Sequence, residues 1–279
     1  DITEQEKKYI KTIAGIFNIL LIGSDMLLEW GRTSERGDAL LLLNTDVNKR
    51  IIRILTIPRD TLIKIPRNAN NAGKWTSKKG EYDKINHALA FGGWQLQQKA
   101  VESFLGIEID NVFFLDLDNL KSIFYAIRQE IGGANVIHDI HKKLGITGMV
   151  REGWDELLYA VTNRENPEAA VGRAKSHAKR LAVCIDLVKE YYNDPSKRNL
   201  FSESTINKLL NLVKYSDLTP QDVSFIITEW CSKEYRIELY YISGKPERIN
   251  DISYWIPINI PGSGDYFTKI VNYRKNMIA

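Results

Sequence analysis

Hydrophobic residues in the first part of the chain fall into short runs separated by turn residues. Three of these runs are rich in Leu and Ile, and each is seven residues long: Phe17–Gly23, Ala39–Thr45 and Ile51–Ile57. Runs of this length between turn residues are typical of buried β-strands. Two later runs, Asn111–Leu117 and Arg236–Ser243, have the same character and are also predicted to be strands.

Longer segments with helical spacing of their apolar residues separate or follow these strands. The predicted helices are Asn86–Leu105, Leu120–Glu130, Glu152–Thr162, Pro167–Tyr192, Ser204–Tyr215 and Pro220–Ser232. The last helix has the best-marked start, because Thr219 can cap it, Pro220 suits the first turn and Asp222 favours the helix dipole. Strands interleaved with helices predict an α/β fold, in which a single domain holds a mixed β-sheet sandwiched between α-helices.

The composition narrows the class of protein. A chain of 279 residues, 44% of them hydrophobic, can bury one sizeable core. With 38 basic and 35 acidic residues the formal net charge is +3, which argues against nucleic-acid binding and leaves any anionic ligand to a local cluster. Cys184 and Cys231 match no disulfide or metal pattern and are interpreted as buried hydrophobic residues. The apolar runs fall short of the roughly 20 residues that a membrane helix needs.

Polar residues gather where the first three predicted strands begin or end. If these strands form an antiparallel meander, the end of the first, the start of the second and the end of the third share one edge of the sheet. Asp25 follows the first strand, Arg36 and Asp38 precede the second, and Arg59 and Asp60 follow the third. The sequence therefore predicts that carboxylates and arginines converge at this edge.

Carboxylates beside arginines allow two interpretations. In one, they form ion pairs that tie loops to the sheet. In the other, Asp25 and Asp38 hold Mg²⁺, which binds one or two carboxylates and completes its shell with water and phosphate oxygens. Arg36 and Arg59 would then bind the phosphates, because a guanidinium group matches phosphate geometry and stays charged. The spacing of these residues leaves both interpretations open.

The sequence around these positions resembles a known family. The segments FNILLIGSD, RGDALLLL, ILTIPRDTLIKIP, DKINHALAFGG, AVESFLGIEIDNVFFLDLDNL and IGG occur in this order between Phe17 and Gly133. They resemble the LytR–CpsA–Psr domain, and weaker similarity continues through Glu152–Arg180 and LLNLVKYSDLTPQDV. The resemblance implies a sheet between helices with a deep apolar pocket for a polyprenyl chain and the pyrophosphate at its mouth. The helical faces in Asn86–Leu105 and Leu120–Ile131 either line that pocket or belong to the ordinary core.

The resemblance also assigns roles to individual residues. Asp25 and Asp38 match the magnesium-site aspartates of the family, and Mg²⁺ is the expected cofactor. The residues expected around the pyrophosphate are Arg36, Arg59, Lys84, Arg164, Arg173 and His177. Asp38, Arg36 and Arg59 are expected to be catalytic, with Asp38 or alternatively Asp60 accepting the proton of the acceptor.

The second half departs from the family pattern. The family usually has an Arg-x-Arg pair and a Gly-Asp-x-Gly-Arg element followed by Arg-Gln-Gln, and Arg164 and Arg173 are retained. Thr162, Ala170 and His177 replace an arginine, an aspartate and a glutamine, and Gly37 stands where the first half of the family has serine. Losing such a phosphate contact would lower the rate by roughly two to three orders of magnitude. His177 either donates a hydrogen bond like the glutamine or has no role.

The resemblance implies a phosphotransferase that moves a glycan phosphate from a polyprenyl-pyrophosphate carrier to peptidoglycan. Residues 1–13 are expected to be a linker after a membrane anchor outside this chain, and residues 14–279 the catalytic domain on the extracytoplasmic face of the membrane. The polymer can be a teichoic acid, a capsule or another polysaccharide. The alternative is a catalytically weakened protein of the same fold that binds polyprenyl phosphate or pyrophosphate lipids. A transcriptional regulator is disfavoured, because the sequence offers neither a recognition helix nor a basic stripe.

Two further patterns have ordinary explanations. His138 and His141 have helical spacing that a metal could use, but no third ligand is evident, and an exposed loop is expected there. Gly92 and Gly93 resemble a phosphate-binding loop only weakly, and a break in the helix explains them.

Overall fold

A central mixed sheet organises the fold. The computed structural model describes residues 15–24, 35–66, 82–133, 136–144 and 171–257. Its six-stranded sheet has the order β7-β6-β1-β2-β3-β8. The strands are β1 (Ile16–Ser24), β2 (Gly37–Asp46), β3 (Ile51–Ile57), β6 (Asn111–Leu115), β7 (Tyr215–Ser216) and β8 (Arg236–Tyr241).

The pairing of the strands confirms the predicted meander. β1 and β2 are antiparallel, as are β2 and β3, whereas β6 and β8 run parallel to β1 and β3 respectively. Ser24 pairs with Gly37, and Leu40 pairs with Ile57. The end of β1, the start of β2 and the end of β3 therefore share one edge of the sheet.

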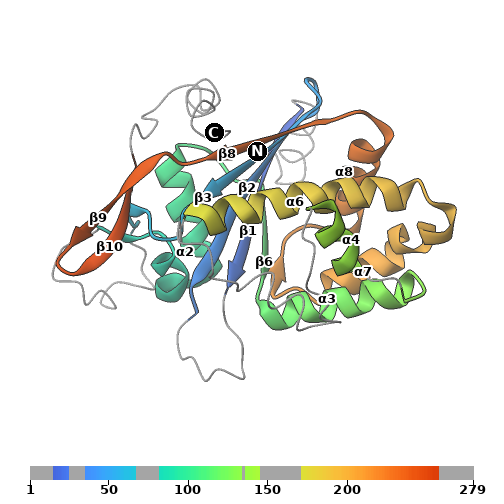
Figure 1. Ribbon diagram of the computed structural model, residues 1–279, viewed down its shortest axis with the longest axis horizontal. Coiled ribbons are helices and arrows are strands. Elements are labelled where there is room, and N and C mark those ends of the chain that lie inside the picture. Colours follow the sequence, from blue (N-terminus) through green and yellow to red (C-terminus); the bar gives the residue numbers. More distant parts are fainter. Residues whose placement is uncertain (1–14, 25–34, 67–81, 134–135, 145–170, 258–279) are drawn as a thin grey trace, which may run out of the picture.

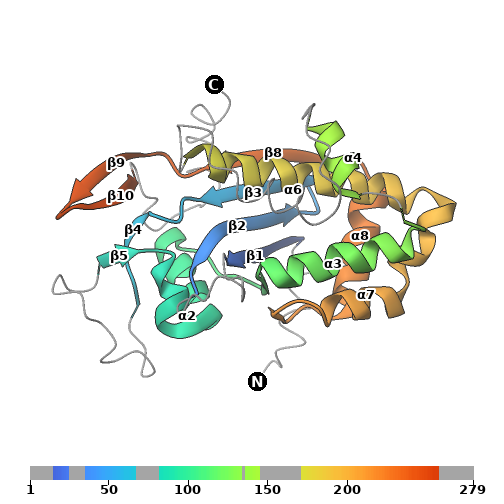
Figure 2. The same ribbon diagram turned by 60° about the horizontal axis from the view of Figure 1, so that its bottom comes forward.

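Helices cover both faces of the sheet, because successive side chains of a strand point to opposite faces. On one face, Leu20, Leu42 and Leu55 pack against α2 (His87–Leu105). On the other face, the residues between them pack against α6 (Val171–Tyr192) and α8 (Pro220–Ser232). Figures 1 and 2 show the sheet between α2 on one side and α6 on the other. The predicted mixed α/β sandwich is confirmed.

A second helical layer lies beyond the sheet, where α6 ends. It contains α3 (Leu117–Glu130), α4 (Val136–Lys143), the 3-10 helix η2 (Pro195–Phe201) and α7 (Glu203–Leu210). The buried residues Ile140, Leu187, Tyr191 and Leu200 form its own small core. α6 therefore connects the sheet layer to this outer helical layer.

Two small two-stranded sheets lie near the strand ends at which the site is predicted. β4 (Leu62–Lys64) pairs with β5 (Tyr82–Lys84), and β9 (Gly244–Ile249) pairs with β10 (Ile252–Pro257). The backbone N–H of Trp255 donates to the carbonyl of Asp60 at 2.8 Å, which joins the two hairpins. The sequence patterns predicted neither hairpin.

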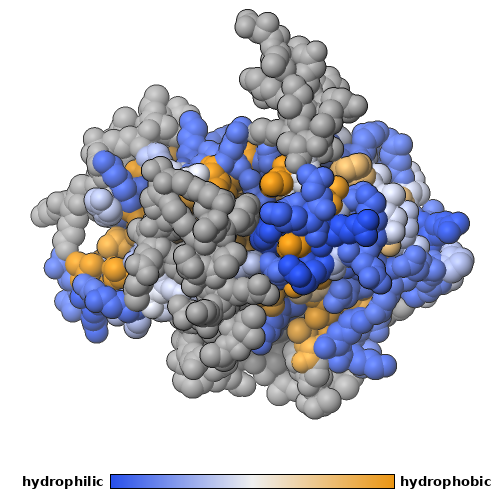
Figure 3. All heavy atoms as spheres, turned by 90° about the horizontal axis from the view of Figure 1, so that it is seen from above, coloured by the Kyte–Doolittle hydropathy of each residue, from blue (hydrophilic) through white to orange (hydrophobic). Residues whose placement is uncertain are grey.

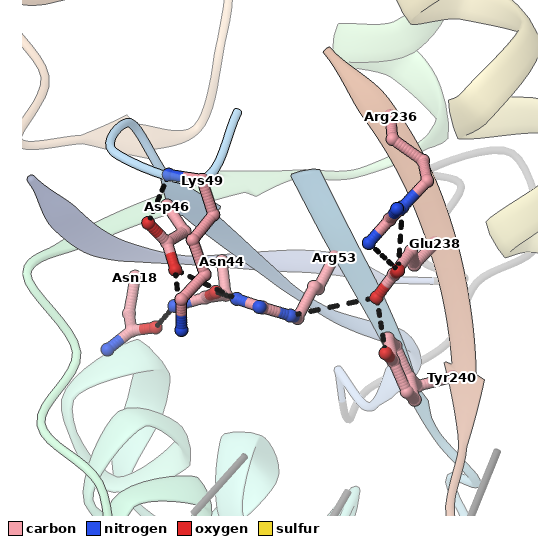
Figure 4. A network of polar contacts seen from close by, with 8 residues as sticks. All are labelled: Asn18, Asn44, Asp46, Lys49, Arg53, Arg236, Glu238 and Tyr240. Carbon is pink, nitrogen blue, oxygen red and sulfur yellow. Dashed lines mark hydrogen bonds and ion pairs between the residues drawn. The ribbon is translucent and has the colours of Figure 1, made fainter. Parts of the chain in front are cut away.

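A polar row crosses the α2 face at the opposite end of the sheet (Figure 4). Asn18, Asn44, Arg53 and Glu238 are register partners on four neighbouring strands. Asn44 donates to Asn18 at 2.8 Å, and Arg53 donates to Asn44 at 3.0 Å and lies 3.8 Å from Glu238. A one-residue slip of any of these strands would break the row, so it stabilises the register of the sheet.

Several predicted boundaries needed correction. The helix expected over Ser204–Tyr215 ends at Leu210, and Tyr215 belongs to β7. The strand expected to reach Leu117 ends at Leu115, because Asp116 caps α3 and starts that helix earlier than predicted. The loop expected around His138 was wrong, because this residue lies in α4. The predicted helix Glu152–Thr162 lies outside the described residues.

Other predictions agree with the structure. The break at Gly92 and Gly93 is confirmed as a kink in α2 with non-helical backbone angles at both residues. Cys184 and Cys231 are free and partly buried, and burial raises the pKa of each thiol to about 11. Inert hydrophobic roles for both are consistent with this. The apolar lipid pocket stays a prediction.

The surface of the described part is mainly polar on the face shown in Figure 3, where hydrophobic side chains appear in small patches between hydrophilic ones. Within the described ranges, no helix is both long enough and apolar enough to cross a membrane.

Candidate functional site

A chain of ion pairs runs along the sheet edge formed by β2, β3 and β5. Arg59 donates through Nη1 to Oδ2 of Asp38 at 2.6 Å, and its Nε lies 3.7 Å from Oδ2 of Asp60. Lys84 donates through Nζ to Oδ1 of Asp60 at 2.7 Å. All four side chains are partly exposed. The structure thus brings together Asp38, Arg59 and Asp60, as the meander predicted, and adds Lys84.

Asn86 connects the start of β2 with the residues that follow β3. Its Nδ2 donates to Oδ1 of Asp38 at 3.4 Å, its backbone N–H donates to the carbonyl of Arg59 at 3.2 Å, and its carbonyl accepts from the N–H of Gly37 at 3.4 Å. Asn86 immediately precedes α2 in the position of a cap but makes no side-chain capping bond. Sequence reasoning missed this role, because it took Asn86 as the first residue of the predicted helix Asn86–Leu105.

Gln97 packs under the same edge. Its side chain is fully buried and donates to the carbonyl of Ile85 at 3.1 Å. A Cβ atom at Gly37 would lie 3.1 Å from Oε1 of Gln97 and 3.2 Å from Leu40. A side chain at position 37 would therefore force Gln97 to shift, which gives a local reason for glycine in this chain.

A second polar group ties the start of β2 to the end of β1. Ser24 donates to Glu35 at 2.7 Å, and Lys214 also reaches Glu35 at 2.7 Å. Lys214 lies 3.5 Å from Asp116, the capping residue of α3, and over the ring of Phe114 at 5.4 Å. The segment that leads into Arg36 is thereby fixed to the rest of the sheet.

The β9–β10 hairpin and the start of α2 flank Lys84. Its Nζ lies 5.6 Å from the ring centroid of Tyr254. Beside it, Asp83 and His87 are 3.1 Å apart. Burial alone would raise the pKa of Asp83, but hydrogen bonds from His87 and from the backbone N–H of Lys84 lower it. Asp83 therefore stays ionised and adds a negative charge beside the lysine.

The structure describes only some of the remaining predicted site residues. Arg36 is exposed directly before β2. Asp25 and Arg164 lie outside the described residues. Arg173 is in the first turn of α6, and the structure describes its backbone only, while His177 is partly buried one turn further on. The structure therefore brings only part of the predicted set together.

Arg180 was not predicted, although helical spacing places it on the face of α6 that carries Arg173 and His177. Its side chain is partly buried, and its Nε is buried without a hydrogen-bond partner. Burial lowers its pKa, and Cys184 opposes this only weakly. A basic residue seven positions after Arg173, on the same face, was the signal that sequence reasoning could have used.

The described half of the predicted magnesium site fits such an ion. Asp38 offers a hard carboxylate oxygen: Oδ2 is held by Arg59, whereas Oδ1, among the residues that the structure describes, has only the 3.4 Å contact with Asn86. Mg²⁺ is commonly bound through one or two carboxylates. The described ranges contain no group of three or more potential metal ligands, and the second predicted ligand, Asp25, is not among them.

Carboxylates, an arginine and a lysine lie together at one edge of a helix-covered mixed sheet, so the fold and the site are those of an α/β protein with a charged cluster at the strand ends. The chain belongs to the LytR_cpsA_psr family, whose model matches residues 1–146, just over half of the 279 residues. The family expected from the sequence is confirmed.

Two relatives illustrate the similarity of sequence. An uncharacterized protein of Staphylococcus aureus is 26% identical over 255 residues, which cover 86% of this chain and 58% of that protein. The polyisoprenyl-teichoic acid–peptidoglycan teichoic acid transferase TagU of Bacillus anthracis is 33% identical over 123 residues, 44% of this chain and 35% of TagU. The matched segments thus span between about a third and three-fifths of these relatives.

Solved structures of TagT show the same fold. TagT bound to LIIa-WTA has a TM-score of 0.62 and 20% sequence identity, covering 94% of this chain and 89% of TagT. TagT with bound octaprenyl pyrophosphate lipid has a TM-score of 0.57 with the same identity and coverage. At this identity the likeness establishes the fold alone.

Proposed function

We propose that this protein is a Mg²⁺-dependent phosphotransferase that moves a glycan phosphate from a polyprenyl-pyrophosphate carrier to peptidoglycan on the extracytoplasmic face of the membrane. The observation that carries the proposal is the sheet edge on which Asp38, Arg59, Asp60 and Lys84 form one connected set of charges. The name of TagU, a teichoic acid transferase, and the pyrophosphate lipid bound by TagT support it.

The basic residues at this edge are suited to pyrophosphate. Phosphoryl transfer depends mainly on positioning and on neutralising charge. Arg59 uses Nη1 for Asp38, which leaves its Nη2 and a second hydrogen of Nη1 for phosphate oxygens. Arg36 is exposed directly before β2, and Lys84 adds a third positive charge. Arg164, Arg173 and His177 complete the proposed binding set from the second half of the chain.

Asp38 is the better candidate for the proton acceptor. Both oxygens of Asp60 face cations, Oδ1 with Lys84 at 2.7 Å and Oδ2 with Arg59 at 3.7 Å. Within the described part of the chain, Oδ1 of Asp38 has only the long contact with Asn86. In the proposed step, an acceptor hydroxyl oxygen bonds to the glycan phosphorus, its proton passes to Asp38, and the bond to the bridging oxygen breaks to release polyprenyl phosphate.

Asp38 and Asp25 are the residues that would hold Mg²⁺. When bound there, the ion would neutralise charge on the pyrophosphate oxygens. In the proposed step, Arg59, which donates to Oδ2 of Asp38 at 2.6 Å, would turn towards the phosphate and leave this carboxylate oxygen to accept the proton.

A second function has support from the sequence departures. Thr162, Ala170 and His177 stand where the family has phosphate-binding residues, so a protein that binds polyprenyl phosphate lipids without turnover is the alternative. It predicts lipid binding that survives chelation of Mg²⁺ and gives no transfer product.

The test is release of polyprenyl phosphate from a short polyprenyl-pyrophosphate glycan in the presence of peptidoglycan fragments, with Mg²⁺ or with EDTA. We expect metal-dependent release by the wild type and a loss of at least about a hundredfold in Asp38→Asn. Asp186→Asn is the matched control, because Asp186 is an exposed carboxylate on α6. Lipid binding without release in the wild type would replace the transferase proposal with the alternative.

A further inference from the structure

A cavity of about 610 Å³ opens where α6 ends, between η2, α7 and α8. Its volume is in the range of small-molecule sites. The lining residues are Tyr192, Arg198, Asn199, Phe201, Ser202, Ile206, Ser224, Ile227 and Thr228. α6 has 22 residues and is therefore about 33 Å long. Figures 1 and 2 show its start on the side of α2 and the β4–β5 hairpin and its end beside α7, so the cavity is remote from Asp38.

The lining combines an aromatic wall with apolar side chains. Tyr192 and Phe201 contact each other edge to face, with ring centroids 5.4 Å apart and an interplanar angle of 70°. Both rings are partly exposed and line the cavity, as do Ile206 and Ile227. Aromatic rings of this kind offer flat apolar surface to the C–H faces of a ligand and lose little side-chain entropy on binding.

Three polar groups of the lining are available to a ligand. Arg198, Ser224 and Thr228 form no hydrogen bond or ion pair with any residue that the structure describes. Ser224 and Thr228 are four residues apart on α8, so their hydroxyl groups lie on one face of that helix. By contrast, Asn199 donates to Glu130 at 2.8 Å, and Ser202 caps α7. The cavity therefore presents a guanidinium group and two hydroxyl groups beside two aromatic rings.

The 3-10 helix η2, which carries Arg198, is held in place by contacts within the protein. Asp194 caps η2 by accepting from the N–H of Ser196 at 2.9 Å, and Lys197 holds Asp194 at 2.6 Å. Lys197 also lies 4.6 Å from the ring centroid of Tyr191. A preformed site loses less entropy on binding than one that must be ordered.

We propose that this cavity binds a sugar phosphate unit of an anionic glycan. The rings would contact the apolar face of the sugar, Ser224 and Thr228 would bond its hydroxyl groups, and Arg198 would pair with the phosphate through its planar donors. A neutral peptide would leave Arg198 without a counter-charge. This inference rests on the proposed function, in which a polymer bound at Asp38 and Arg59 is long enough to reach a second site.

A second contact far from the reacting groups should change how tightly the polymer binds, and should leave the chemical step unchanged. The two sites act on one chain, so the second contact raises the effective concentration of the first. Loss of the cavity contact should raise KM for a long glycan donor and leave KM for a single-unit donor and both kcat values unchanged.

The direct test is binding of N-acetylglucosamine 1-phosphate, followed by NMR and calorimetry, which needs no transferase activity. We expect chemical-shift changes in η2 and α8, and an affinity about tenfold lower in Arg198→Gln, because a charge-assisted hydrogen bond is lost. Phe201→Ala should weaken binding as well. Arg198 is exposed, so the Arg198→Gln variant should fold even if Phe201→Ala does not.

Two controls make the result decisive. Arg248→Gln removes an exposed arginine of the β9–β10 hairpin and should bind the sugar phosphate like the wild type. In Arg59→Gln, which alters the proposed pyrophosphate site, the chemical-shift changes of η2 and α8 should persist. Equal binding of unphosphorylated N-acetylglucosamine, or equal affinity in Arg198→Gln, would overturn the inference. Binding at the cavity without any transfer activity would overturn only the proposed reaction.

Discussion

Asp38 is held from two sides, by Arg59 at 2.6 Å on one oxygen and by Asn86 at 3.4 Å on the other. Arg59 can exchange this contact for a phosphate, but Asn86 cannot move in the same way. Its backbone is bonded to Arg59 and to Gly37, and its side chain is 3% exposed. Asn86 is therefore a positioning residue for Asp38.

Replacing Asn86 by alanine should lower kcat of the proposed transfer by about ten- to a hundredfold, as for other residues that orient a ligand or a base. KM should change much less, because Asn86 contacts Asp38 and lies buried below the exposed basic residues. Asn207→Ala, at an exposed position of α7, is the control. A lower melting temperature with unchanged kcat would mean that Asn86 has a structural role only.

Lys214 should matter more for substrate binding than for folding. Its pairs with Glu35 and Asp116 are partly exposed, so Lys214→Met should lower the free energy of unfolding by at most about 1 kcal/mol. Because Glu35 adjoins Arg36, KM for the donor should rise by about tenfold. Lys208→Met, which breaks a comparable pair with Glu130, should leave KM unaltered. Equal KM values in the two variants would contradict this prediction.

The polar row across the sheet should respond strongly to loss of one partner. Arg53 and Glu238 are 8% and 9% exposed, and Arg53→Met would remove one of the two cations beside Glu238, which keeps Arg236 at 2.8 Å. We expect a loss of about 1–3 kcal/mol in the free energy of unfolding, measured in urea, because the buried Asn44 also loses its donor. The double variant Arg53→Met/Glu238→Gln should recover part of this loss. A single-variant effect below about 1 kcal/mol would show that the row contributes little.

Arg180→Met, unlike Arg53→Met, should not lower the stability of the protein. Because the buried Nε of Arg180 has no partner, an apolar side chain of similar length removes a desolvation cost and no bond. The melting temperature should stay equal or rise, as measured by calorimetry. If Arg180 also contacts the pyrophosphate, the same variant should bind polyprenyl pyrophosphate less tightly. A fall of several degrees would instead show that Arg180 stabilises the fold.

The cap of η2 gives a pH dependence. Hydrogen bonds from Lys197 and Ser196 lower the pKa of Asp194 from 3.8 to about 2. A carboxyl group whose pKa is depressed by folding stabilises the native state above its unfolded pKa and ceases to do so as the pH falls through the folded value. The stability difference between the wild type and Asp194→Asn should therefore be constant above about pH 4 and shrink between pH 4 and 2. A constant difference over the whole range would exclude this cause.

The sequence predicted the parts of the fold that depend on local pattern. The five long strands and helix α8 were recognisable because runs of Leu and Ile and the cap at Thr219 are local features. The meander then placed Asp38, Arg59 and Asp60 together, because antiparallel pairing alone fixes which strand ends meet.

What escaped prediction depends on contacts between distant segments. Asn86 looks like the first residue of a helix until the position of Asp38, 48 residues earlier, is known. Lys214 reaches Glu35 across 179 residues, and no periodicity reveals such a pair. β9 is mostly polar and pairs only with β10, outside the main sheet. The helix predicted over Ser204–Tyr215 was too long, because helical spacing continues past Leu210 while pairing with β6 takes Tyr215 into the sheet.

The parallel pairing of β3 with β8 has a consequence for biosynthesis. β3 ends at Ile57, but its outer neighbour begins at Arg236, so almost 180 residues must leave the ribosome before this edge of the sheet is covered. Until then, β3 is an apolar strand with unpaired backbone groups, the kind of edge that invites association with other chains. The strand that leads directly into Arg59 is thus the last of the meander to be paired on both sides, and the nascent protein depends on its own C-terminal region to keep this strand from aggregating.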